Sequence, residues 1–241
     1  MMKQTDIAIK SCRWHLAPDE DAFRRQAVDI VLVTADASIR ERGQFHLVLA
    51  GGNTPCSIYK ELRSVRAEWP AWHLYFGDER CVSEDDPERN SRLAIDAWLS
   101  HVPIPPGQIH VIQGELGARQ AAASYAALLR GLGDFDLVLL GLGEDGHTAS
   151  LFPGDDWGMS AESADALPVF DAPKPPPERV TLSAARLSRA GTVLFLISGE
   201  SKRKALADWR SGGAIPASAI CPPGGIDVLV STELFDSTVA N

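Results

Sequence analysis

A glycine-rich turn at residues 141–147 carries the side chain best suited to chemistry. The turn reads Gly-Leu-Gly-Glu-Asp-Gly-His and follows an apolar run. Its glycines and small polar residues leave room for a substrate beside His147, and an imidazole that titrates near neutral pH can take a proton and return it. The other histidines, at positions 15, 46, 73, 101 and 110, have no such setting and are interpreted as structural. His147 is therefore the candidate catalytic residue.

The same turn contains a G-x-G-x-x-G pattern, which is typical of dinucleotide-binding loops. Such a loop should run into a regular helix and then a second strand that ends in an acidic residue about 20 positions on. Here the chain instead reaches Phe152-Pro153-Gly154 and a proline-rich stretch. A dinucleotide-dependent oxidoreductase is therefore a disfavoured alternative, and we expect no cofactor.

A second glycine-rich loop, Gly51-Gly52-Asn53-Thr54-Pro55, has the features of an anion site. The two glycines let the backbone approach a ligand closely. Thr54 and Pro55 are predicted as the N-cap and first residue of a helix that continues to about Arg66. The N-terminus of that helix would present free N–H groups and a positive dipole, for which phosphate is the natural ligand.

Cationic side chains occur at three further junctions. Gly77-Asp78-Glu79-Arg80 follows an apolar run, and Arg80 is its best candidate for a ligand contact. Residues 198–204 place Lys202 at another strand-to-helix junction, where lysines early in a helix oppose the dipole and an anion would relieve the repulsion. The last two residues of that run can equally form a solvated surface. Arg179 stands at the end of a long irregular stretch.

Strand–loop–helix units must position these loops. Short apolar runs that predict strands occupy residues 45–50, 72–76, 108–112, 134–140, 192–198 and 227–231. Helices are predicted over 19–42, 54–66, 117–131 and 200–209. Strands that are apolar on both faces and alternate with helices indicate a parallel sheet covered on both sides. Ligands of such sheets bind outside the carboxyl ends of the strands, where the candidate loops fall.

We therefore predict an α/β fold with a Rossmann-like, mostly parallel sheet and helices on both faces. No shift in composition and no internal repeat divides the chain, so a single domain over residues 1–241 is expected. The stretch 153–178, rich in proline, is the one long irregular segment in this prediction. Loops of that length are usually functional.

The composition limits the classes of partner that this protein can bind. Of 241 residues, 45% are hydrophobic and 23% charged, which is typical of a globular protein and excludes disordered, collagen-like and coiled-coil classes. The net charge of −9 leaves no basic stripe for nucleic acid. An anionic substrate must therefore be held by locally concentrated cations and backbone N–H groups.

Targeting and redox signals are sparse. The N-terminal stretch lacks the apolar run of a secretion signal, and no segment approaches the ~20 apolar residues of a membrane span. Cys12, Cys56, Cys81 and Cys221 form no C-x-x-C pair and have no histidine cluster nearby, so no metal site is expected. Buried thiols in a reducing compartment are the expected state, and a cytoplasmic protein without membrane contact is predicted.

Together these loops resemble the 6-phosphogluconolactonase family. The resemblance is carried by GGNTP, YFGDER, DLVLLGLGEDGHTASLFPG, PPERVTL and GESK, in the family's order and at compatible spacing over nearly the whole chain. It implies a fold like that of glucosamine-6-phosphate deaminase and ribose-5-phosphate isomerase. It also implies a hydrolase of carbohydrate metabolism, which opens 6-phosphoglucono-δ-lactone in the pentose phosphate pathway. The family's first loop often reads GGSTP, and Asn53 replaces that serine while keeping a donor.

The resemblance also implies roles for individual residues. His147 becomes the general base that activates water, and no metal or covalent nucleophile is required. The expected substrate-binding or phosphate-binding residues are Gly51, Gly52, Asn53, Thr54, Asp78, Arg80, Gly143, Asp145, Gly146, Arg179 and Lys202. The expected partner is a small phosphosugar lactone, bound by a monomer or a small homo-oligomer.

Two alternatives stay open. A glucosamine-6-phosphate deaminase would carry an acidic residue shortly after its histidine, in a stretch like H-I-A-F-N-E, whereas residues 148–153 here read Thr-Ala-Ser-Leu-Phe-Pro. A non-catalytic sugar-phosphate sensor would carry a DNA-binding segment. Residues 1–44 contain one amphipathic helix and too few basic residues for that role.

Overall fold

The computed structural model describes residues 12–235. The first eleven residues, which contribute to the prediction that no secretion signal is present, lie outside that range. Among the described residues, no helix combines the length and apolar character needed to cross a membrane.

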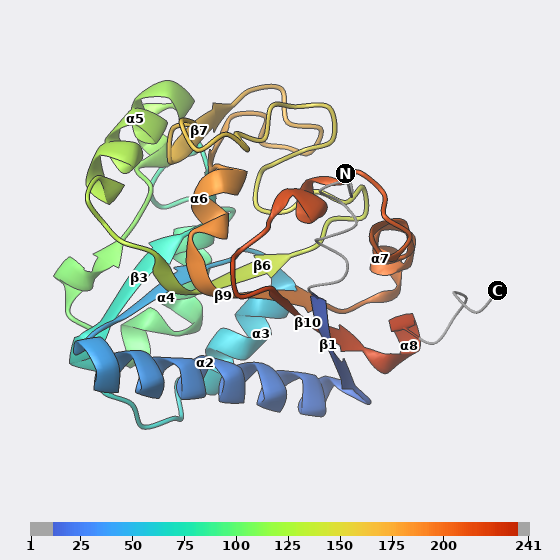
Figure 1. The fold of residues 1–241 in the computed structure, drawn as a ribbon. Helices are drawn as coiled ribbons and strands as arrows, with labels where there is room; N and C mark the ends of the chain where they lie inside the picture. Colours follow the sequence, from blue (N-terminus) through green and yellow to red (C-terminus); the bar gives the residue numbers. More distant parts are fainter. Residues whose placement is uncertain (1–11, 236–241) are drawn as a thin grey trace.

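A seven-stranded sheet, parallel throughout, forms the centre of the molecule (Figure 1). Its order is β1 (Cys12–Ala17), β10 (Ile226–Ser231), β9 (Ala190–Ile197), β6 (Phe135–Gly141), β2 (Phe45–Leu49), β3 (Trp72–Phe76) and β5 (Ile109–His110). Every residue of β2 is buried, as expected for a strand covered on both faces. The predicted parallel sheet is confirmed. The run 108–112 pairs over only two residues, and the edge strand β1 was not predicted.

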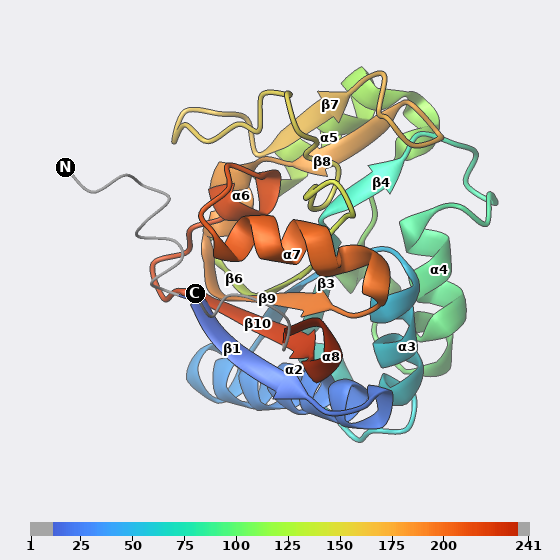
Figure 2. The same cartoon turned by 90° about the vertical axis from the view of Figure 1, so that its right-hand side faces the viewer.

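Helices cover both faces of the sheet, as predicted (Figure 2). Helices α2 (Glu20–Arg42) and α3 (Asn53–Leu62) lie against one face, and α6 (Ala184–Ser188) and α7 (Arg203–Arg210) lie against the other. The remaining helices are α4 (Asn90–Ala97), α5 (Ala118–Leu129) and α8 (Thr232–Phe235). A 3₁₀ turn over Glu200–Lys202 precedes α7, so the predicted helix 200–209 is regular only in its second part.

Helix α2 shows why its ends are readable from the sequence. The Asp19 carboxylate accepts a hydrogen bond from the Ala22 N–H at 2.7 Å and caps the first turn. At the other end Gly43, with φ of 76°, donates its N–H to the Ile39 carbonyl at 2.8 Å. Such a left-handed cap is favourable for glycine because it has no Cβ.

A second, antiparallel sheet was not predicted. It has the order β4 (Asp78–Arg80), β8 (Arg179–Leu182) and β7 (Ala166–Val169), and α5 packs against it (Figure 1). The stretch 77–80 is thus partly a strand, and the stretch 153–178 contains one. Pairing of β4 with β8 sets Arg80 opposite Arg179, although about a hundred residues separate them in the chain.

Three of the histidines interpreted as structural lie side by side on the sheet. His46, His73 and His110 occupy adjacent strands β2, β3 and β5, where their rings stack at centroid distances of 4.9 and 5.9 Å. The four cysteines are half-buried, and no disulfide joins them. Buried thiols were expected, and the degree of burial is therefore lower than predicted.

Candidate active site

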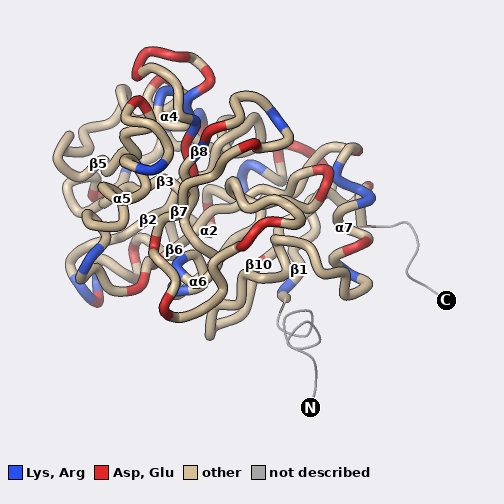
Figure 3. The backbone as a smooth tube through the Cα atoms, turned by 90° about the horizontal axis from the view of Figure 1, so that it is seen from above, with Lys and Arg blue, Asp and Glu red and all other residues tan. Residues whose placement is uncertain are grey.

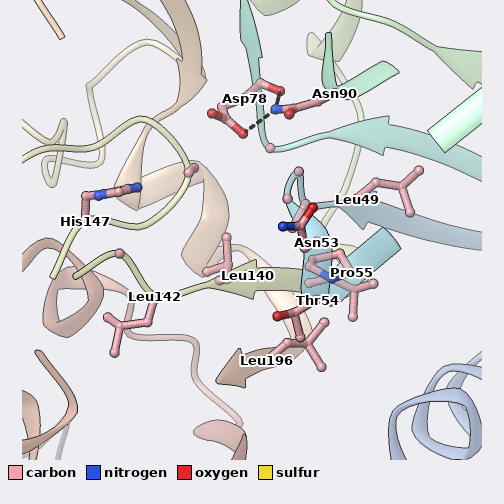
Figure 4. Close-up of a pocket in the computed structure, with 18 of the residues that line it drawn as sticks. Leu49, Asn53, Thr54, Pro55, Asp78, Asn90, Leu140, Leu142, His147 and Leu196 are labelled. Atoms are coloured by element: carbon pink, nitrogen blue, oxygen red, sulfur yellow. Dashed lines mark hydrogen bonds between the residues drawn. The ribbon is translucent and has the colours of Figure 1, made fainter. Parts of the chain in front are cut away.

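A cavity of about 330 Å³ opens at the carboxyl ends of β2, β3, β6 and β9. The predicted residues that line it are Gly51, Gly52, Asn53, Thr54, Asp78, Arg80, Gly143, His147, Arg179 and Lys202. Asp145 and Gly146 lie behind this lining. Figure 4 shows His147 on one side of the cavity and Asn53 and Thr54 on the other. The fold therefore brings together loops that are up to about 150 residues apart in the chain.

The turn after β6 holds His147 by several short contacts. The Gly143 N–H donates to the His147 carbonyl at 2.7 Å, and the Gly146 N–H donates to the Gly143 carbonyl at 3.1 Å. Gly146 has a φ of +85°, and a Cβ there would also meet Ile215 at 2.9 Å. No regular helix follows the turn, so its G-x-G-x-x-G pattern does not form a dinucleotide loop.

The Asp145 carboxylate determines which imidazole nitrogen can react. Its Oδ1 lies 2.5 Å from the His147 Nδ1. An ionised carboxylate can only accept, so Nδ1 carries the proton and Nε2 keeps its lone pair. Asp145 is predicted as a substrate-binding residue, and in the structure its carboxylate contacts the His147 ring.

Charges around His147 tune its pKa. Burial lowers the pKa of the imidazole, while the hydrogen bond and the charge of Asp145 raise it. The nearby ammonium of Lys174 lowers it further, and the net pKa lies below the ordinary value. His147 is thus neutral at pH 7 and able to accept a proton.

The anion loop differs in detail from its prediction. Gly52, with φ of 99°, is the residue before α3, and the helix begins at Asn53. Thr54 is therefore not the N-cap. Its hydroxyl instead forms a 2.9 Å hydrogen bond with the hydroxyl of Ser198, which joins the loops after β2 and β9. Helix α3 also ends at Leu62 rather than near position 66.

Asn90 explains the other glycine of this loop. A Cβ on Gly51 would lie 1.9 Å from the Asn90 Oδ1, so only glycine fits there. The amide of Asn90 is itself fixed, because its Nδ2 donates to the carbonyl and the carboxylate of Asp78, each at 2.9 Å. The N-terminus of α3, with the unpaired N–H groups of a first helical turn, thus lies at the cavity.

Lys202 differs from its two cationic neighbours. It is half-buried in the cavity wall, and burial lowers the pKa of its ammonium. Among residues 12–235, its ammonium has no hydrogen-bond or ion-pair partner. Arg203 is held by Glu200 at 2.7 Å and Lys204 by Asp208 at 2.8 Å, so both belong to the solvated surface. An anion in the cavity would supply the missing partner of Lys202.

Asp78 is the one acidic residue among the described residues that line the cavity, where Arg80, Lys174, Arg179 and Lys202 supply positive charge. Its Oδ2 accepts a hydrogen bond from the Ser150 hydroxyl at 2.6 Å, and its Oδ1 accepts from Asn90. Asp78 is predicted among the substrate-binding or phosphate-binding residues. A carboxylate repels phosphate, so of these two roles its chemistry suits a contact with the sugar. Its remaining lone pairs suit the hydroxyl group of a sugar.

Sequence reasoning missed Asn90, Ser150, Ser198 and Lys174 as residues of this site. Asn90 comes from a segment without a glycine-rich pattern, and Ser150 follows His147 by three residues. Both reach Asp78 only through the tertiary fold. Lys174 lies in the proline-rich stretch, whose length was the one available signal. Within the described residues, no group of three or more His, Cys, Asp or Glu is placed to hold a metal ion.

Comparisons with known proteins agree with this arrangement. A family model described as glucosamine-6-phosphate isomerases/6-phosphogluconolactonase matches residues 18–229. The chain is 36% identical to 6-phosphogluconolactonase 3, chloroplastic, of Arabidopsis thaliana, over 83% of this chain and 68% of that protein. It is 37% identical to 6-phosphogluconolactonase of Mycobacterium tuberculosis, over 83% and 86% of the two chains.

The fold has a solved counterpart as well. The crystal structure of 6-phosphogluconolactonase from Thermotoga maritima is similar with a TM-score of 0.84 and 28% identity, and the match covers 91% of this chain and 99% of that one. The chain belongs to the glucosamine-6-phosphate isomerase/6-phosphogluconolactonase family.

Proposed function

We propose that this protein hydrolyses 6-phosphoglucono-δ-lactone to 6-phosphogluconate in the pentose phosphate pathway, with His147 as the general base. One observation carries the proposal. The Asp145–His147 pair leaves an unprotonated Nε2 in a cavity whose opposite wall is an anion site at the N-terminus of α3. The relatives named 6-phosphogluconolactonase support the same substrate.

The reaction needs a base beside the lactone carbonyl, and the Asp145–His147 pair supplies one. His147 takes a proton from water as its oxygen attacks the lactone carbonyl, and a tetrahedral oxyanion forms. The bond to the ring oxygen then breaks, and the imidazolium returns the proton to that oxygen. Such acid–base catalysis contributes roughly 10²- to 10⁴-fold, or about 3–5 kcal/mol.

The cavity offers separate partners to the two ends of the substrate. The N–H groups around Gly52, Asn53 and Thr54, together with Lys202, suit the phosphate. Arg80 and Arg179 add positive charge from the second sheet. Asp78 suits a ring hydroxyl. Gly143 and Gly146 shape the turn that holds His147.

The direct test uses purified protein and freshly made lactone. We expect hydrolysis well above the enzyme-free rate in the presence of a chelator, because the mechanism uses only protein side chains. Activity that is lost with the chelator and restored by a divalent ion would contradict the metal-free mechanism. Release of ammonia from glucosamine 6-phosphate would instead identify a deaminase, and tight phosphosugar binding without turnover would identify a sensor.

We further propose that the protein acts in the cytoplasm and binds neither nucleic acid nor membranes. Over the described residues in Figure 3, Lys and Arg (blue) are interspersed with Asp and Glu (red). The net charge of −9 and the four cysteines, which form no disulfide, support the same view. Light scattering after size exclusion tests the expected monomer or small homo-oligomer.

The turn offers a matched pair of glycine variants. A Cβ on Gly143 would lie 2.0 Å from the His147 Nδ1, whereas a Cβ on Gly141 would meet nothing within 4 Å. Gly143→Ala should therefore displace the imidazole and lower kcat at least tenfold. Gly141→Ala should keep wild-type kcat. Equal activity of the two variants, both with a wild-type melting temperature, would show that the close approach to Gly143 does not position His147.

A further inference from the structure

A proline-rich segment at residues 170–178, here called the strap, forms part of the cavity wall. It joins β7 to β8, and its residues Lys174 and Pro175 line the cavity. The buried guanidinium of Arg179 holds the strap in place. Its Nη2 donates to the carbonyls of Lys174 and Pro175 at 2.8 and 3.0 Å, and its Nε donates to the carbonyl of Pro176 at 3.1 Å. The backbone of Lys174 is thus fixed while its side chain is exposed.

Lys174, His147 and Lys202 line the same cavity. The positive charge of Lys174 lowers the pKa of both other side chains, so its ammonium lies within electrostatic reach of the base. The Arg179 guanidinium lies 5.6 Å from the Phe152 ring, which packs 4.9 Å from the His147 ring, but its nitrogens already donate to the strap carbonyls. Lys174 therefore adds a positive charge near His147 that the strap does not engage.

The ammonium of Lys174 is available for a ligand. Among the residues that the structure describes, none forms a hydrogen bond or an ion pair with it. Lysine places a compact charge on a flexible stem, so a fixed backbone at the cavity wall still lets the ammonium reach a reacting atom. The proposed mechanism also has an unmet requirement, because the oxyanion formed beside His147 needs an electrophile.

From this geometry we propose that Lys174 binds the lactone carbonyl oxygen and stabilises the tetrahedral oxyanion, with Arg179 acting through the strap as its positioning residue. The proposal rests on the lactonase function proposed above. The carbonyl oxygen gains negative charge as water attacks, so an ammonium beside it binds the transition state more strongly than the substrate. A contact with the remote phosphate would instead bind both states equally.

Steady-state kinetics separates these two roles. Lys174→Met should lower kcat about 10²- to 10³-fold, the usual loss when one oxyanion donor is removed, with little change in KM. Inorganic phosphate is the probe of the phosphate site, and its inhibition constant should stay within twofold. Lys202→Met should show the opposite pattern, with a higher KM and weaker phosphate inhibition. Lys204→Met, which removes an exposed lysine paired with Asp208, is the matched control and should behave as wild type.

A second readout reports the position of Lys174 without turnover. Removal of a positive charge favours the protonated imidazole, so the pKa of His147 should rise in Lys174→Met and stay unchanged in Lys204→Met, as measured by NMR titration. Lys174→Arg keeps the charge and should recover part of the lost kcat.

The outcomes distinguish the proposal from the function on which it rests. A wild-type protein that does not hydrolyse the lactone would overturn both. An active wild type whose Lys174→Met variant keeps kcat within threefold would overturn the oxyanion role alone. Weaker phosphate inhibition in that variant, with kcat unchanged, would assign Lys174 to the phosphate instead.

Discussion

His147→Gln should lower kcat by roughly 10²- to 10⁴-fold while folding and phosphate affinity stay nearly intact. Glutamine can hydrogen-bond the attacking water, but it cannot accept a proton at neutral pH. The phosphate site lies on the other wall of the cavity, so inhibition by inorganic phosphate should be close to that of the wild type. The measurement is steady-state hydrolysis of fresh lactone, with an enzyme-free control subtracted at each pH because the lactone also hydrolyses spontaneously.

The pH profile of the wild type provides an independent check on the same residue. A base works only when deprotonated, so kcat/KM should fall as the pH drops through the pKa of His147. Burial places that pKa below its ordinary value of about 6.5, so the midpoint of the decline should lie below pH 6.5. A folded His147→Gln enzyme within threefold of the wild type would remove the general-base role.

Asp145→Asn is expected to be the second most damaging change, with kcat lowered about 10²-fold or more. The variant keeps the size of the side chain, but its amide can donate a hydrogen bond to Nδ1. The imidazole would then carry its proton on Nε2, the nitrogen that must act as the base. Loss of the negative charge also lowers the pKa of His147, so the acid limb of the remaining activity should move to lower pH.

The matched control for this change is Asp155→Asn. Asp155 is an exposed acid eight residues beyond His147, and its N–H bonds the Phe152 carbonyl at 3.3 Å. This variant removes the same charge near the turn and should leave both kcat and the pH profile unchanged. If Asp145→Asn keeps kcat within threefold of the wild type, the carboxylate does not select the tautomer of His147.

Local signals determined much of the fold. The strand 72–76 was predicted with its observed ends because its apolar run stops at a glycine. Helix α2 begins and ends within one residue of its prediction because Asp19 and Gly43 act as caps through contacts no more than four residues away. Such interactions depend on neighbours in the sequence and can be read from it.

Tertiary pairing decided what the sequence left undefined. The strands β4, β7 and β8 are three or four residues long and lack a periodic pattern. They form because segments far apart in the chain pair with one another. The start of α3 shows the same effect on a smaller scale, since Thr54 bonds Ser198 instead of capping its own helix.

For the candidate site, too, some features could be predicted from the sequence and others required the tertiary structure. Glycine-rich turns at the carboxyl ends of strands identified His147 and the anion loop, because glycine content and strand patterns are local properties. The sequence did not show which side chains contact one another, since Asn90 reaches Gly51 and Asp78 only in the folded chain. The sequence alone thus determined which residues could react. The tertiary structure decided which of them meet, because Thr54 bonds Ser198 and Ser150 bonds Asp78 through contacts between distant segments.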